Sequence, residues 1–101
     1  MLFRSAAKDA LDLLRAHPDA HQRGRLLLTL ARVARSQKRP KQAVEQFREA
    51  IAIFKKGRHQ AELAEAAREV GMYLKERGEH AEAAEYLAMA ITAERSAPGT
   101  R

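Results

Sequence analysis

Apolar residues recur along this chain at spacings of three and four, which is the pattern of amphipathic helices rather than of strands. Between residues 40 and 56, for example, Phe47, Ala50, Ile51 and Phe54 fall on one side of a helix. Polar and charged residues occupy the positions between them, so each such stretch has a buried side and a solvated side. The pattern predicts five helices, over about residues 2–16, 20–37, 40–56, 59–77 and 79–95.

The breaks between these stretches contain residues that end or begin helices. The residue before Pro18 is pushed out of helical geometry, and Pro40 suits the first position of the third helix. Gly57 and Gly78 are predicted to stop the third and fourth helices. We therefore expect a single helical domain over residues 1–96, followed by a frayed tail at 97–101.

The chain also repeats itself at a constant offset, the one that separates Ala43 from Ala83. This repeat offset aligns four apolar positions of the third predicted helix with four of the fifth: Ala43, Phe47, Ala50 and Ile51 with Ala83, Leu87, Ala90 and Ile91. One offset earlier, the same positions lie in the first predicted helix as Phe3, Ala7, Ala10 and Leu11. Repeats of this length indicate stacked helix pairs, here two pairs and one leading helix.

In the segment from 67 to 91, the residue types and spacing resemble those of the tetratricopeptide-repeat family. The residues that fit the family pattern are Gly71, Leu74, Gly78, Ala83, Leu87 and Ala90. The resemblance implies an all-α superhelix, a solenoid of five antiparallel helices that binds a protein or peptide; we expect no cofactor. Two departures are the repeat offset, which is longer than the family's usual unit, and Lys55 and Arg95, which stand where the family has a proline that closes the second helix. The preceding unit fits less well, because Lys38 replaces the turn glycine.

Composition narrows the function classes. The chain has no Cys, which excludes disulfides, thiolate zinc sites and cysteine nucleophiles, and we expect a cytoplasmic protein. No apolar run reaches the ~18 residues that would span a membrane.

The net charge of +6 is uneven, because residues 24–60 carry ten Lys and Arg against two Glu, whereas residues 61–101 carry five Lys and Arg against eight acids. Such asymmetry indicates nucleic acid, an acidic partner, or complementary ends that attract each other.

Candidate catalytic and metal-binding residues are few. His17 and His21 have the four-residue spacing of two ligands on one helix face, but Pro18 breaks that helix. His59 and His80 fall at predicted helix starts, where we expect them to be solvated. No Ser lies in a tight turn after a strand, and the glycines occur singly. The sequence therefore predicts neither an enzyme nor a metal site.

The resemblance also implies which residues line the concave face of the solenoid. The first helix of each unit would contribute Arg25, Leu28, Arg32, Arg35 and Ser36, and then Glu65, Arg68, Met72, Lys75 and Glu76. Five of these ten side chains are cationic, and the planar guanidinium of arginine fits a carboxylate, which favours an acidic peptide. The predicted partner-binding residues are Arg25, Leu28, Arg32, Arg35, Arg68, Met72 and Lys75, and we expect Arg32 and Arg35 to face solvent.

Two other functions stay open at this stage. One is homodimerisation, or assembly within a larger bacterial regulator of which this chain is a piece, because a short repeat array leaves a face uncovered. The other is nucleic-acid binding through the basic central section. The second is disfavoured because Tyr73 and Tyr86 are the only aromatic residues outside the predicted core.

Overall fold

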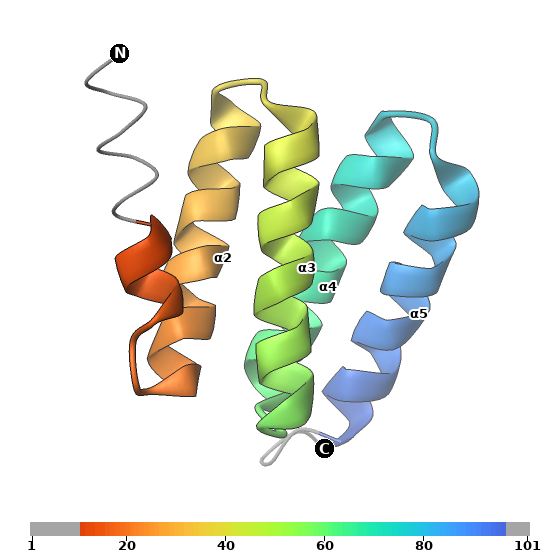
Figure 1. The fold of residues 1–101 in the computed structure, drawn as a ribbon. Coiled ribbons are helices and arrows are strands. Elements are labelled where there is room, and N and C mark those ends of the chain that lie inside the picture. Colours follow the sequence, from red (N-terminus) through yellow and green to blue (C-terminus); the bar gives the residue numbers. More distant parts are fainter. Residues whose placement is uncertain (1–10, 97–101) are drawn as a thin grey trace.

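The computed structural model describes residues 11–96, which form an all-α chain of antiparallel helices (Figure 1). The four complete helices are α2 (Ala20–Ser36), α3 (Pro40–Lys56), α4 (Gln60–Glu76) and α5 (His80–Ser96). Residues 11–15 are helical and form the described end of the leading helix. The prediction of two helix pairs is confirmed, and the bounds of every complete helix lie within one residue of the predicted ones. The rest of the leading helix and the expected tail at 97–101 lie outside the described residues.

The four complete helices are equal in length and evenly spaced along the chain. Each has 17 residues, and they begin at Ala20, Pro40, Gln60 and His80, so the repeat offset consists of two equal halves. The three turns between them share one hydrogen-bond pattern. The backbone N–H groups of Arg39, His59 and Glu79 donate to the carbonyls of Ala34, Phe54 and Leu74, each at 2.9 Å. This 6→1 bond closes a Schellman turn, whose preceding residue adopts a left-handed conformation.

The left-handed positions of the three turns are Lys38, Arg58 and Gly78, with φ of 59°, 59° and 83°. As predicted, α3 ends directly before Gly57, but Gly57 itself has φ −82° and the left-handed residue is Arg58, one position later. Gly78, which was predicted to stop α4, is itself the left-handed residue of its turn. Because a side chain in this region costs roughly 1–2 kcal/mol, only the last of the three turns is free of backbone strain.

Small residues lie where the two helices of a pair come closest. Gly71 of α4 is buried, and a Cβ atom added to it would lie 2.8 Å from Cγ and Cδ2 of Leu87 in α5. Ala50 and Ala90, which the repeat offset aligns with each other, are buried at 0% and 3% exposure. The largest side chains of the core lie between and beside these contacts; they are Phe47, Phe54, Leu27, Leu74 and Val70. Close helix packing of this kind leaves little room for larger residues.

The outer side of α5 differs from the expected apolar stripe. Ile91 is 54% exposed, although its equivalent in the preceding unit, Ile51, is 5% exposed. Ile51 lies in α3, which packs against α4, whereas within residues 11–96 no helix follows α5. The expectation that Ile91 belongs to a buried stripe is therefore wrong for the described part of the chain.

Candidate functional site

The face formed by α2 and α4 contains the residues that the sequence analysis predicted to bind a partner. A shallow pocket of about 300 Å³ lies between these two helices. Its lining residues are Gln22, Arg25, Leu26, Leu28, Thr29, Arg32, Glu62 and Glu65. We call the surface that runs along both helices from Arg25 and Glu62 to Arg35 and Glu69 the α2–α4 face.

Arginines of α2 and glutamates of α4 form a network along the α2–α4 face. Arg32 Nε donates to both carboxylate oxygens of Glu69, at 2.9 and 3.1 Å, and its Nη2 donates to Glu65 at 2.6 Å. Arg35 Nη1 lies 3.4 Å from Glu69. The hydrogen bond to Glu69 is the main reason that the pKa of Arg32 is raised above its ordinary value, against an opposing effect of burial. Arg32 and Arg35, which we expected to face solvent, are partly exposed, at 38% and 35% of the side chain, and are held by carboxylates of their own chain.

Arg25 is the more available cation of this face. Its Nη1 lies 3.7 Å from Oε2 of Glu62, and 60% of its side chain is exposed. Leu28 beside it is buried and forms part of the pocket floor. An ion pair this long and this exposed contributes little to stability, so Arg25 can exchange its partner at low cost.

The remaining predicted binding residues lie farther along α4. Met72 is 46% exposed and Lys75 is exposed near the end of the helix. Arg68 forms an ion pair with Glu94 of α5. The structure thus brings Arg25, Leu28 and Arg32 together at one pocket and leaves these α4 residues outside its lining.

The charge asymmetry of the sequence has an explanation within the fold. Arg48 of α3 pairs with Glu82 of α5, and Arg15 pairs with Glu49 of α3. Both pairs, like Arg35 with Glu69, join residues 34 positions apart. Basic residues of one unit therefore face acidic residues of the next within the chain.

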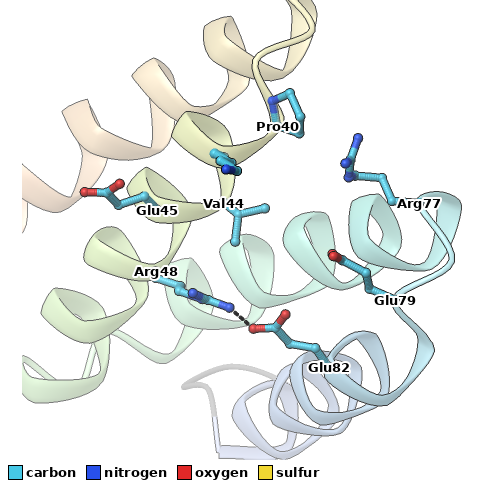
Figure 2. Close-up of a pocket in the computed structure, with 8 residues that line it drawn as sticks. Pro40, Val44, Glu45, Arg48, Arg77, Glu79 and Glu82 are labelled. Atoms are coloured by element: carbon cyan, nitrogen blue, oxygen red, sulfur yellow. Dashed lines mark hydrogen bonds and ion pairs between the residues drawn. The ribbon is translucent and has the colours of Figure 1, made fainter.

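A second pocket, of about 490 Å³, lies elsewhere on the molecule, between α3 and the start of α5. Figure 2 shows Arg77 and Glu79, from the turn before α5, across this pocket from Pro40 and Val44. Its dashed line marks the ion pair between Arg48 and Glu82. Charges of both signs around an open pocket are typical of a solvated surface, and no catalytic pair is evident among its lining residues.

Sequence reasoning missed a cluster at one end of the α2–α4 face. His21, at the start of α2, lies with its Nε2 2.6 Å from Oε2 of Glu62, in the first turn of α4. The ring of His59 stacks on that of His21, with centroids 4.0 Å apart. The expectation that His59 is solvated is therefore wrong, whereas His80 is exposed as expected. The signal that could have predicted this cluster was the repeat offset, since residues one offset apart occupy equivalent positions in α2 and α4.

Burial and polar contacts act in opposite directions on Glu62. Burial alone would raise its pKa, but the hydrogen bond with His21 and the neighbouring imidazoles outweigh it. The net effect is a pKa below the ordinary value for glutamate. The carboxylate of Glu62 is therefore kept ionised at one end of the pocket.

Comparison with known proteins identifies one part of the chain. Residues 24–56, which cover most of α2 and all of α3, match the family model of the tetratricopeptide repeat. No curated protein and no solved structure matches the chain. Among residues 11–96, no helix is both long enough and apolar enough to cross a membrane.

Proposed function

We propose that the chain binds a segment of another protein along the α2–α4 face. Residues 24–56 form a tetratricopeptide repeat, and this repeat generally mediates protein–protein interaction and is not a catalytic fold. The observation that carries the proposal is the pocket between α2 and α4, which contains Arg25, Leu28 and Arg32. These residues come from the first helix of the matched repeat.

The chemistry of the pocket describes the segment it would bind. Arg25 offers an exposed guanidinium to a carboxylate of the partner, and Leu26 and Leu28 offer an apolar surface beside it. Guanidinium groups bind carboxylates through two parallel hydrogen bonds, which adds direction to the contact. We therefore favour a peptide in which an acidic residue lies next to an apolar one.

The proposed site would select for a single acidic side chain, which is a narrower preference than the acidic peptide that the sequence indicated. Arg32 and Arg35 are occupied by Glu65 and Glu69, so an incoming carboxylate would have to compete with an intramolecular one. A uniformly acidic peptide would also meet the carboxylates of α4. Selectivity for one acidic side chain at Arg25, rather than for total negative charge, follows from this arrangement.

A peptide-library selection tests the proposal. The wild-type chain, Arg25→Gln and Lys56→Gln are each used to select from a random library, and the enriched sequences are measured by fluorescence anisotropy. Lys56 is exposed at the end of α3, so its variant matches the charge change away from the α2–α4 face. We expect peptides with an adjacent acidic and apolar residue to bind the wild type and Lys56→Gln alike, and Arg25→Gln several-fold more weakly.

Several outcomes would contradict the proposal. Peptides that bind all three proteins equally would place the interaction elsewhere on the chain. Enrichment that depends only on total negative charge, and disappears steeply with salt, would favour nucleic acid as the partner of the basic surface.

The exposure of Ile91 supports a second candidate function, self-association. Ile91 is 54% exposed, and in the preceding unit the equivalent Ile51 is buried. A second copy that covers α5 would bury Ile91 as the following helix pair buries Ile51. Light scattering of the wild type and of Ile91→Ser separates the two candidates, because a dimer through α5 should become a monomer only in the variant.

A further inference from the structure

We propose that His21, His59 and Glu62 form a binding site for a divalent transition-metal ion, with Zn²⁺ as the reference ion. One nitrogen of each imidazole and one carboxylate oxygen lie within 4.8 Å of one another. Two imidazoles and one carboxylate are a ligand set that zinc and the neighbouring first-row ions bind in proteins. The proposal is independent of the proposed peptide binding.

Two segments, the starts of α2 and α4, place these ligands. His21 is the second residue of α2, His59 precedes the first residue of α4, and Glu62 lies in the first turn of α4. His59 makes no side-chain cap bond to α4, so capping does not engage its ring nitrogens. Residues from two stacked helix pairs therefore meet at one point, which a metal ion would tie together.

Phe54 and Gly57 form the surroundings of the two imidazoles. Phe54, which is fully buried, lies edge-on to both rings, with centroids 6.2 Å from His21 and 6.4 Å from His59. Gly57 makes room for the second ring, since a Cβ atom there would lie 2.7 Å from Cδ2 and 2.8 Å from Nε2 of His59. The conformation of Gly57 is open to any residue, so its lack of a side chain matters here for space and not for backbone geometry.

Coordination of an ion requires these side chains to rearrange, because the two imidazole rings stack on one another without an ion. Metal–ligand distances of about 2.0–2.2 Å in a tetrahedral site require ligand atoms that are roughly 3.3 Å apart. His21 and Glu62 are already 2.6 Å apart, and their side chains are 37% and 23% exposed, which leaves room for rotation. Three ligands on the protein leave a fourth position for water or for a partner side chain.

Arg25 is the nearest competitor for the carboxylate. Its guanidinium lies 3.7 Å from Oε2 of Glu62, so a bound cation would displace it or be repelled by it. Removal of this charge should therefore strengthen metal binding. This effect distinguishes a site built around Glu62 from nonspecific binding to exposed histidines.

The test is calorimetric titration of Zn²⁺ into chelator-treated, tag-free protein, with Co²⁺ absorption as a second readout of coordination. The wild type should bind one equivalent. His59→Ala and His21→Ala should weaken binding by more than the roughly 10- to 100-fold that loss of an outer-shell partner causes. His80→Ala, which removes an exposed histidine at the start of α5, should bind like the wild type.

Arg25→Gln should bind Zn²⁺ more tightly than the wild type, and Mg²⁺, which prefers an all-oxygen site, should not bind. Circular dichroism of each variant confirms that the helices are retained. The proposal fails if the wild type does not bind Zn²⁺, or if His80→Ala weakens binding as much as His59→Ala does. It also fails if all histidine variants bind equally, because the ion would then be held elsewhere.

Discussion

Arg32 of α2 and Glu69 of α4 join the two helix pairs through a two-pronged ion pair, in which Arg32 Nε contacts both carboxylate oxygens at 2.9 and 3.1 Å. The Arg32 side chain is 38% exposed and that of Glu69 is 22% exposed, so the pair is partly shielded from water. Glu65 and Arg35 extend it into a network. Networks with this geometry stabilise more than isolated surface pairs do.

Reversal of one charge in this pair should destabilise the fold. Arg32→Glu places a third carboxylate beside Glu65 and Glu69, and we expect a loss of about 1–2 kcal/mol in the free energy of unfolding. Urea denaturation followed by circular dichroism measures this loss. Adding Glu69→Arg to Arg32→Glu should restore part of the stability, because the pair is then re-formed with its charges exchanged.

The double variant is the decisive measurement for this network. A coupling energy near zero in the double-mutant cycle would show that the two side chains do not interact in solution. Glu85→Arg, which reverses an exposed charge on α5, is the control and should leave stability nearly unchanged.

Lys38 and Arg58 occupy left-handed positions at φ 59°, where the third turn has Gly78. Replacement of either residue by glycine should stabilise the chain by about 0.5–1 kcal/mol, since the backbone strain is removed while the 6→1 hydrogen bond of the Schellman turn remains. Gly78→Ala should destabilise it by a similar amount. Thermal unfolding measures all three changes, and a loss of stability in Lys38→Gly would show that the lysine side chain has a role that outweighs its backbone strain.

Much of the fold could be predicted because both signals can be read from the sequence itself: helix periodicity comes from neighbouring residues, and the repeat offset comes from comparing the chain with itself. Ala50 and Ala90 were aligned with each other on the apolar side of their helices by the repeat offset, and both are buried. Ile91 was misassigned for the same reason: the register describes a unit inside an array, and α5 has no following helix among the described residues.

The candidate site was harder to predict because it depends on pairs of residues in different helices. The sequence shows Arg32 as one of many cations, and only the stacking of α2 on α4 reveals that Glu65 and Glu69 hold it. His21 and Glu62 are likewise separated by 41 positions. Charges of opposite sign at an offset of 34 would have been a usable signal, since three ion pairs of the structure have that spacing.

Glu62 should make stability depend on pH in the acidic range. Its folded-state pKa is lowered, so its contribution is fully present above the unfolded value of about 4.3 and is lost as the pH falls through the folded value. In the presence of a chelator, Glu62→Gln should unfold about 5 °C below the wild type at pH 6, if the lost interaction is worth about 1 kcal/mol.

The difference between the wild type and Glu62→Gln should shrink as the pH falls below about 4, because the wild-type carboxyl is then protonated as well. Glu85→Gln, which removes an exposed carboxylate from α5, controls for general charge effects. A difference that stays constant down to about pH 3 would mean that the amide is poorly accommodated and that ionisation of Glu62 contributes nothing.

Ala50 and Ala90 are buried at equivalent positions of the two units, and both should resist enlargement. Ala50→Leu and Ala90→Leu each add three carbons where helices are in close contact, and we expect losses of about 1–3 kcal/mol in the free energy of unfolding. Ala52→Leu and Ala88→Leu make the same change at exposed positions of α3 and α5 and should be nearly neutral. Because the comparison within each helix holds helix propensity constant, a buried variant as stable as its exposed control would refute the assigned repeat register.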